Sequence, residues 1–471
     1  MTVEAVLSSH RGLIVAPAGC GKTHLITETL NSTSNKPFLV LTHTTAGVAA
    51  LKSRLKRLGV PNYQYVVATI DGWALRISTM FPGSCNVVAT PDTPKVFYPE
   101  LRRKVNKYID SGHISDLIQS TYSRLLVDEY QDCNSDQHAL ICSISEFLPT
   151  IVFGDPMQCI FNFSDPMPCW VNGVQARFPI ICELNTPWRW INAGTPNLGR
   201  WIINCRNLLN KGNPIDLLSC PEYVQWHQLT GNYQTDSKNQ IDVQYQIRKK
   251  NAASDSLLII GNPYKADLRH RFASTAIGID VVEPVDLKDI LNDASKFDTS
   301  NGVKLASHVI DSVSTMMTGI RKEYLLKRVA TILASRNRTP ATALEIAVKC
   351  VVEQGDNNSI DNLLSCLELC SETRIYRKGA FSALKSAVSL SIGDSNKTIR
   401  QSAEIIREQR RHQGDRRIPT KAIGSTLLLK GLEADHVFIL DADGMNSHNL
   451  YVALSRGAKS ITVFSNKNIL P

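Results

Sequence analysis

The residues best suited to chemistry form a glycine loop near the start of the chain, Ala16-Pro17-Ala18-Gly19-Cys20-Gly21-Lys22-Thr23. An apolar run, Leu13–Val15, precedes this loop, and a helical pattern begins at about Lys22. The two glycines allow backbone N–H groups to curl around phosphate oxygens, and the helix N-terminus adds the positive end of its dipole. Lys22 would reach the β- and γ-phosphates, and Thr23 would offer a hydroxyl to Mg²⁺. The order strand, loop, helix therefore predicts a site for ATP and Mg²⁺.

A second signal is a pair of carboxylates, Asp128 and Glu129, which follow the apolar run Arg124–Val127. A strand that ends in this pair would deliver both side chains to the edge of a sheet. Asp128 could hold Mg²⁺ through its water shell, and Glu129 could orient and deprotonate an attacking water. Together with the glycine loop, the pair predicts nucleotide hydrolysis.

These groups need a parallel sheet to hold them. Apolar runs at Leu13–Val15, Phe38–Leu41, Arg124–Val127 and Ile151–Phe153 each end where polar residues begin, and a helical pattern over Ala46–Leu58 separates two of them. Alternation of this kind is typical of an α/β fold with ligands at the carboxyl ends of its strands. A second set of short runs is Ser256–Ile260, Asp280–Val282, Val437–Leu440 and Ile461–Phe464. Between Leu287 and Arg417 the sequence shows helical spacing and no strand pattern, as at Val303–Met317 and Glu323–Ala334.

Composition bounds the class of protein. The chain has 471 residues and a formal net charge of +9, from 52 Lys+Arg against 43 Asp+Glu, which favours a polyanionic partner. The short basic clusters are equally compatible with solvated helix faces; they lie at Lys52–Arg57, Arg102–Lys104 and Arg407–Arg417. The 12 cysteines form no CxxC pair, so free thiols are expected. With no bilayer-length apolar run and no secretory pattern at the start, we expect a cytoplasmic protein without a membrane partner.

Several segments together resemble one enzyme family. The acidic turn Asp128-Glu129-Tyr130-Gln131-Asp132, with Gly154–Phe161 after the next strand, is similar to the UvrD/Rep/PcrA branch of superfamily 1 DNA helicases. Further segments resemble the family's motifs in the family's order: Thr42–Leu55, Thr69–Trp73, Leu184–Arg189, Lys430–Asp435 and Tyr451–Lys459.

The resemblance implies two RecA-like P-loop lobes with parallel sheets. The expected division gives lobe 1A residues 1–74 and 123–183, and lobe 2A residues 184–286 and 418–471. A small insertion, 75–122, would interrupt the first lobe and would contain Pro/Gly-rich loops and a helix near Glu100–Ile109. A helical insertion, 287–417, would interrupt the second lobe. Both insertions are short for the family, which puts strand separation in doubt.

The resemblance also assigns roles at the nucleotide. Gln158 would sense the γ-phosphate, and Arg189 and Arg456 would reach the phosphates from the second lobe, because a planar guanidinium suits the charge that builds on the γ-phosphoryl group. Gly431 and Glu433 would contact the nucleotide. Asp132 would tie the acidic turn to neighbouring motifs.

DNA contacts are expected along the top of both lobes, where aromatics stack on bases and hydroxyls hold phosphates. The candidates are Thr42, Thr44, Thr69, Trp73, Phe161 and Phe163, with Trp188 in addition. For each aromatic, packing in the core is the competing interpretation.

The sequence departs from the family in places that bear on function. The family's adenine-reading Gln is missing, with Glu4 near its place, so base selectivity is open. Pro187 stands where Asn is usual, and Ser425–Leu429 is more apolar than its counterpart. The first hypothesis is an ATP-driven 3′–5′ translocase on single-stranded DNA, with duplex unwinding possible. The alternative is a DNA-stimulated NTPase that acts as a sensor subunit beside a nuclease. Compact UvrD-like proteins of similar layout occur with OLD-family nucleases in Gabija-type anti-phage systems. An RNA helicase is a third hypothesis.

Overall fold

The computed structural model describes residues 3–32, 34–91, 93–160, 166–284, 287–394, 396–413 and 419–471. The chain divides into two compact units. Unit 1 comprises Met1–Trp226, Met445–Ile461 and Asn468–Pro471, and unit 2 comprises His227–Gly444 and Thr462–Lys467. Both carry a six-stranded sheet in an α/β arrangement, as the sequence predicted, and the unit boundary passes through strands β8 (Val224–Gln228) and β15 (Gly457–Ser465).

The first sheet has the order β3-β2-β4-β5-β1-β6, and every neighbouring pair is parallel. Its strands are β1 (Arg11–Val15), β2 (Phe38–Thr42), β3 (Tyr65–Thr69), β4 (Leu125–Val127), β5 (Thr150–Gly154) and β6 (Ile180–Glu183). The order places β5 between β1 and β4. The loop after β5 therefore lies between the glycine loop and the acidic turn.

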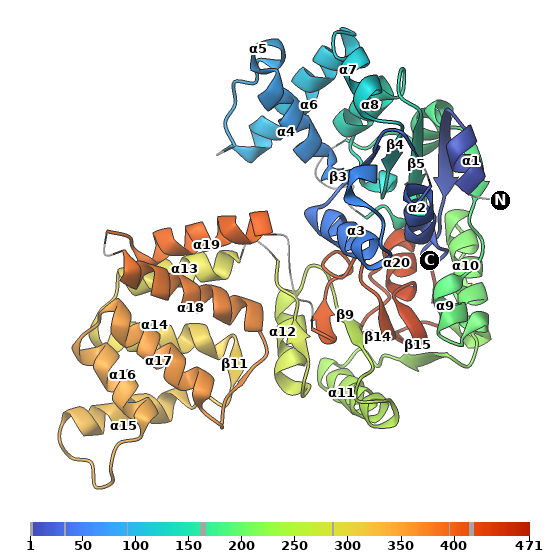
Figure 1. Ribbon diagram of the computed structural model, residues 1–471. Coiled ribbons are helices and arrows are strands. Elements are labelled where there is room, and N and C mark those ends of the chain that lie inside the picture. Colours follow the sequence, from blue (N-terminus) through green and yellow to red (C-terminus); the bar gives the residue numbers. More distant parts are fainter. Residues whose placement is uncertain are drawn as a thin grey trace. The chain divides into compact units, whose positions relative to one another are not determined.

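Successive residues of these strands face opposite sides of the sheet, and both sides are buried. Leu39, Leu41 and Leu125 join one core with α4 (Ile70–Met80), α6 (Pro94–Asp110) and α8 (Ser135–Ile144). Val40 and Leu126 join a second core with α2 (Lys22–Leu30) and α3 (Thr45–Arg57). Burial on both faces explains why these strands are continuous apolar runs. Figure 1 shows the two groups of helices on either side of the first sheet.

The segment 75–122 contains more helix than the sequence predicted. α5 (Pro82–Cys85), α6 and α7 (Ser115–Thr121) fill most of it, where one helix and Pro/Gly-rich loops were expected. α6 begins at Pro94, because proline is accommodated in the first turn, and its residues Phe97, Leu101 and Val105 belong to the same core as the sheet. The helices thus form part of the cover of the first sheet. The division of the chain into 1A and 1B parts stays a prediction.

The remaining elements of unit 1 follow β6 or come from the end of the chain. α9 (Trp188–Asn192) and α10 (Pro196–Asn210) follow β6, and α20 (Ser447–Leu454) packs against α10. β7 (Ile215–Asp216) and β16 (Ile469–Leu470) form a small antiparallel pair. α1 (Val3–Ser8) packs against α2.

The second sheet has the order β10-β13-β9-β14-β15-β8. β9 (Leu257–Ile260) pairs in parallel with β13 (Lys421–Gly424) and with β14 (Ala434–Ile439), and β13 pairs in parallel with β10 (Asp280–Val281). α11 (Tyr233–Lys250) and α12 (Ala266–Thr275) pack against each other, and side chains of both join the core of this sheet.

The segment 287–417 is mainly helical, as expected. α13 (Lys288–Asp298), α14 (Gly302–Ser314), α15 (Lys322–Leu333), α16 (Ala343–Glu353), α17 (Asn357–Leu369), α18 (Lys378–Gly393) and α19 (Ile399–Gln413) share one apolar core and form the yellow-to-orange group in Figure 1. It also contains two short strands that no sequence pattern indicated: β11 (Met317–Thr318) pairs antiparallel with β12 (Arg374–Ile375). Strands of two residues are too short to show a period of two. Within the part of the chain that the structure describes, no helix combines the length and apolarity needed to cross a bilayer.

Candidate nucleotide site

The glycine loop connects β1 to α2 with the backbone that a phosphate cradle requires. Gly19 and Gly21 have φ values of 71° and 92°, in the left-handed region that residues with a Cβ rarely adopt. Gly21 is the N-cap of α2, and Leu25 N donates to Gly21 O at 2.9 Å. At the other end, Ala16 N donates to Gly154 O at 3.0 Å. The loop is therefore fixed between β5 and the first turn of α2.

Lys22 bridges both carboxylates of the acidic turn. Its Nζ lies 3.1 Å from Asp128 Oδ1 and 2.5 Å from Glu129 Oε1, and the Lys22 and Asp128 side chains are nearly buried. Burial alone would lower the pKa of Lys22, but Asp128 and Glu129 reverse the effect and the net shift is upward, so the lysine stays protonated. Burial raises the pKa of Asp128, with Glu129 adding and Lys22 opposing, because two carboxylates share one ammonium. The sequence predicted these groups, and the structure brings all three together.

Glu129 is held in an unusual backbone conformation. Its φ is 54°, which is uncommon for a residue with a side chain. Its N–H donates to Asp128 Oδ1 at 2.9 Å, and its Oε2 accepts from Gln131 Nε2 at 2.5 Å. The left-handed turn aims the carboxylate back toward Lys22. Strain of this kind persists only where surrounding contacts fix it.

Gln131 connects the acidic turn to the loop after β5. While its Nε2 donates to Glu129, its Oε1 accepts from Asp155 N at 3.2 Å. Asp155 in turn accepts from Gln158 Nε2 at 3.1 Å through Oδ2. Gln158, the predicted γ-phosphate sensor, is thus connected to Glu129 through Asp155 and Gln131. The sequence indicated Gln158 but not the bridging Gln131.

Arg206 is a charged group that the sequence did not reveal as part of the site. It projects from α10, and its Nε and Nη2 lie 3.0 and 2.8 Å from Oδ1 of the fully buried Asp155. Burial would lower the pKa of Arg206, but Asp155 outweighs it and the net shift is upward. Nothing in the spacing of the sequence links two residues on separate elements in this way.

Tyr451, the first residue of the family-like segment Tyr451–Lys459, contacts the glycine loop directly. Ala18 N donates to Tyr451 Oη at 3.0 Å, and the side chain is buried in α20. Burial, with Asp155 adding, raises the pKa of Tyr451 well above its ordinary value, so the hydroxyl stays neutral. A neutral hydroxyl can accept from the loop amide. The sequence indicated no role for this tyrosine.

α9 covers the outer side of the loop. Arg189 N donates to Gly19 O at 3.1 Å, and a Cβ added at Gly19 would lie 2.8 Å from the ring of Trp190. A Cβ added at Gly21 would lie 3.1 Å from Trp188 Cδ1. Both glycines therefore allow close approach as well as positive φ. Trp188 is 49% exposed, so its ring could still stack on a planar ligand.

Both predicted arginine fingers lie in unit 1 with the glycine loop, and both reach the end of α20. The Arg189 guanidinium donates through Nη1 to Ser455 O and lies over the Trp190 ring. Arg456 is buried; it donates through Nε to Val452 O at 2.9 Å and through Nη2 to Ser455 Oγ at 2.9 Å. Trp190 Nε1 donates to Gly457 O at 2.7 Å, which fastens α9 to the same segment. Contact of either arginine with phosphate stays a prediction.

The residues present fit Mg·ATP. Gly19 and Gly21 have no Cβ that would keep a phosphate away from their backbone amides, and Lys22 lies beside them. Thr23, in the first turn of α2, and Asp128 would supply hydroxyl and carboxylate oxygens to Mg²⁺, with phosphate oxygens completing its shell. Ala16, Pro17, Ala18 and Cys20 contribute backbone to the loop. Burial raises the pKa of the Cys20 thiol to about 12, so this cysteine is inert.

The residues predicted to contact DNA lie in different environments, and contact with DNA stays a prediction. Thr44 and Thr69 cap α3 and α4, accepting from Gly47 N and Gly72 N, so their hydroxyls already have partners. Thr42 is buried. Trp73 is 1% exposed and belongs to the core of the first sheet. Its environment therefore favours the interpretation as a core residue over stacking on a base. Phe161 and Phe163 lie outside the described residues.

Gly431 and Glu433 lie in unit 2, just before β14. Gly431 has a φ of 81°, and both residues are exposed. Their contact with a nucleotide stays a prediction.

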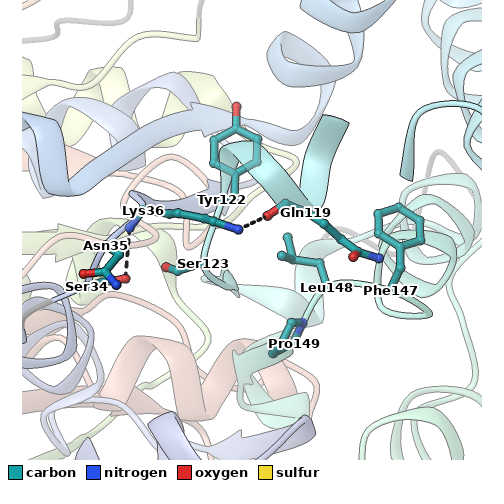
Figure 2. Close-up of a pocket in the computed structure, with 9 residues that line it drawn as sticks. All are labelled: Ser34, Asn35, Lys36, Gln119, Tyr122, Ser123, Phe147, Leu148 and Pro149. Atoms are coloured by element: carbon teal, nitrogen blue, oxygen red, sulfur yellow. Dashed lines mark hydrogen bonds between the residues drawn. The ribbon is translucent and has the colours of Figure 1, made fainter. Parts of the chain in front are cut away.

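A surface pocket lies at the opposite ends of the strands of the first sheet. Residues before β2, β4 and β5 line it, together with Gln119 and Phe147: Ser34, Asn35, Lys36, Tyr122, Ser123, Leu148 and Pro149. Figure 2 shows Lys36 extended toward Gln119, whose carbonyl oxygen accepts from Nζ at 2.7 Å. Because ligands of parallel α/β sheets bind at the carboxyl ends of strands, this pocket is separate from the candidate site.

Comparison with known proteins supports a helicase-type domain. Residues 97–178 match the family model of the UvrD/REP helicase N-terminal domain, a range that includes the acidic turn, Asp155 and Gln158. No curated protein matches the chain. Among solved structures, the chain is similar to a helicase in a complex of arterivirus nonstructural protein 10 with DNA, at 12% identity and a TM-score of 0.28. That similarity covers 55% of this chain and 49% of the other, so the chain spans about half the length of that helicase.

Proposed function

We propose that the chain is a DNA-stimulated ATPase of the UvrD type that couples hydrolysis to 3′–5′ movement on single-stranded DNA. The observation that carries the proposal is the joint placement of Lys22, Asp128 and Glu129 beside a loop with left-handed glycines. The family match over residues 97–178 supports it, because that range contains the acidic turn. The net charge of +9 suits a polyanionic partner.

The proposed mechanism follows from the ion pairs at Lys22. Bound Mg²⁺ would neutralise charge on the phosphate oxygens. Lys22 would donate to the β- and γ-phosphates and so leave Glu129, whose carboxylate would then be available to accept a proton from the attacking water. Gln131 would hold Glu129 in place during this exchange, since it donates to the other carboxylate oxygen. Gln158 would report the γ-phosphate to Asp155, with which it is hydrogen-bonded.

A second candidate is an NTPase that senses DNA as a subunit beside a nuclease and unwinds little. One observation favours it: in the apolar segment Ser425–Leu429, which precedes the family-like segment Lys430–Asp435, Ser425, Thr426 and Leu429 are buried, so they offer little polar surface to a DNA strand. A nuclease of the OLD family, as in Gabija-type defence systems, is the partner that this candidate implies. Its place in antiviral defence is part of this second proposal.

One set of measurements separates the two. ATP hydrolysis is compared without nucleic acid and with single-stranded DNA, single-stranded RNA or blunt duplex DNA. Strand displacement is then followed on duplexes with 3′ or 5′ tails. DNA-stimulated hydrolysis with displacement from a 3′ tail supports the first proposal, and stimulation without displacement supports the second. Hydrolysis that no nucleic acid stimulates contradicts both, and stimulation by RNA alone would indicate an RNA helicase.

A further inference from the structure

The strongest observation outside the nucleotide site is a nearly buried ion pair between Asp71 and Arg102. Arg102 Nε lies 2.7 Å from Asp71 Oδ1, and Arg102 Nη2 lies 2.7 Å from Asp71 Oδ2. The Asp71 side chain is 23% exposed, and the Arg102 side chain is 9% exposed. A bidentate guanidinium–carboxylate pair fixes both distance and angle between the elements that carry it. Here those elements are α4 and α6.

Asp71 belongs to the segment that follows β3. It lies in the first turn of α4, two residues after Thr69, whose hydroxyl caps the helix by accepting from Gly72 N at 2.9 Å. A Cβ on Gly72 would lie 2.7 Å from that hydroxyl, so a side chain does not fit there without a shift. The Asp71 carboxylate therefore stands in the capped first turn of α4, where it can follow a shift of the Thr69 segment.

The same carboxylate is bonded to the exit of the acidic turn. Gln137 Nε2 donates to Asp71 Oδ1 at 3.2 Å, and Gln137 Oε1 accepts from Asn134 N at 3.2 Å. Asn134 Oδ1 accepts from Gln137 N at 2.9 Å, which completes a capping box at the start of α8. Asn134 is three residues beyond Gln131, the side chain that holds Glu129. A connected path of hydrogen bonds and a short stretch of backbone thus runs from Asp71 to the predicted general base.

Electrostatics support the same grouping. Cys133, in the middle of this path, is fully buried, and its pKa is raised well above the ordinary value by burial first and then by Asp132 and Asp71, with Arg102 opposing. Asp132, Asp71 and Arg102 therefore lie around one thiol. Arg102 balances a cluster of acidic groups that would otherwise repel one another.

We propose that Asp71 and Arg102 are positioning residues that transmit the state of the Thr69 segment to the acidic turn, and so set how strongly nucleic acid stimulates hydrolysis. The inference rests on the proposed function, because it requires a polymer that stimulates the ATPase. Neither side chain needs to touch nucleotide or DNA. The pair acts through Gln137 and Asn134 on the placement of Glu129.

The test compares Arg102→Met, which keeps length and loses charge, with Arg102→Lys and with the double variant D71N/R102M. Arg103→Met is the matched control, because Arg103 is exposed and donates only within its own helix among the bonds that the structure shows, to Pro99 O at 3.2 Å. Each protein is assayed for hydrolysis without DNA and with saturating single-stranded DNA, for DNA affinity by fluorescence anisotropy, and for melting temperature.

In R102M we expect the ratio of DNA-stimulated to basal hydrolysis to fall about tenfold, a size usual for coupling between sites. Basal turnover and DNA affinity should stay within about threefold of wild type, R102K should recover part of the ratio, and R103M should leave it unchanged. The stimulation ratio should be no lower in D71N/R102M than in R102M, because both substitutions remove the same Asp71–Arg102 ion pair.

Two results overturn the inference while leaving the proposed function intact. The first is a wild-type stimulation ratio in R102M and in the double variant. The second is an equal loss of basal and stimulated turnover in R102M, accompanied by a lower melting temperature, with turnover recovered in D71N/R102M. That result would show that the pair is purely structural. A wild-type protein that DNA does not stimulate overturns the proposed function as well, and the wild-type measurement alone reveals that case.

Discussion

The carboxyl ends of the two sheets differ sharply, although both sheets have six strands and mostly the same parallel pairing. In the first sheet this edge carries Lys22, Asp128, Glu129 and Asp155, joined by ion pairs and side-chain bonds. In the second sheet, side-chain carbon atoms lie against the backbone at the ends of β9 and β13. A Cβ on Gly261, after β9, would lie 2.7 Å from Arg269 Cγ, and one on Gly424, at the end of β13, would lie 2.9 Å from Leu429 Cγ.

The difference shows that a parallel sheet is not sufficient for phosphate binding. The residues in the loops at the carboxyl ends of its strands decide whether phosphate can bind there. Buried charges are stable at the first edge because each has a partner of opposite sign. At the second edge the carboxylate Asp441 has a pKa raised, chiefly by burial. We therefore expect substitutions at the first edge to affect chemistry and equivalent ones at the second to spare it.

The largest expected effect is that of Lys22→Ala. Removal of the cation from the phosphate site should lower ATP hydrolysis by at least about a hundredfold, since a single preorganised charge in such a site contributes that much. Lys265→Ala, which changes a lysine shortly after β9, is the matched control and should stay within about threefold of wild type. Steady-state phosphate release measures both. Normal turnover in K22A would show that the glycine loop is not the hydrolytic site.

Glu129→Gln should be nearly as damaging, but in a different way. Loss of the proton acceptor should slow hydrolysis about 100- to 10,000-fold, while ATP binding persists because Lys22 and the loop remain. Asp441→Asn, which alters a carboxylate after β14, should leave hydrolysis near wild type. Single-turnover hydrolysis and nucleotide titration separate the two steps. An E129Q protein that hydrolyses ATP normally would mean that another group activates the water.

Two buried ion pairs, one in each unit, allow the effects of losing a buried cation on protein stability and on ATP hydrolysis to be compared. Arg206→Met leaves the fully buried Asp155 without its cation, and Arg377→Met does the same to Glu283, from which Arg377 Nε lies 2.6 Å away. Each change should cost about 3–5 kcal/mol of unfolding free energy, the usual penalty for a buried charge that loses its partner.

Assayed well below its melting temperature, R206M should also hydrolyse ATP more slowly, because Asp155 orients Gln158. R377M should retain its turnover. Denaturant unfolding and phosphate release give the two readouts. Equal turnover in the two variants would remove Arg206 from the nucleotide site.

The smallest expected effect is that of Thr426→Val at the second edge. The hydroxyl is buried, and no hydrogen-bond partner is found for it among the described residues. Replacement by a methyl should therefore leave stability unchanged or raise it by up to about 1 kcal/mol. DNA affinity should not change. A weaker affinity for single-stranded DNA in T426V would show that this segment reorganises to meet the strand.

Much of the local structure was predictable. The runs that gave β1, β2, β4 and β5 were recognised because a strand buried on both faces is continuously apolar, and α3 was recognised by its period. β3 and β6 were not predicted; they are the two edge strands of the sheet, and most of their residues are only partly buried. Trp73 could not be assigned, since an aromatic residue looks the same in sequence whether it stacks on a base or fills a core.

The sequence by itself determined the groups that carry local chemistry: glycines where φ must be positive, a lysine at the first helical turn, and two carboxylates at the end of a strand. These depend on neighbours in the chain, and the order of residues is enough to show them. The tertiary structure decided which distant groups complete the site. Gln131 reaches Asp155 because β5 lies next to β4, and Arg206 reaches the same residue from α10. Tyr451 accepts a hydrogen bond from Ala18 N, although the two residues are 433 positions apart in the sequence. Such partners are chosen by packing and by the cost of burying an unpaired polar group, and neither leaves a period or a motif in the sequence.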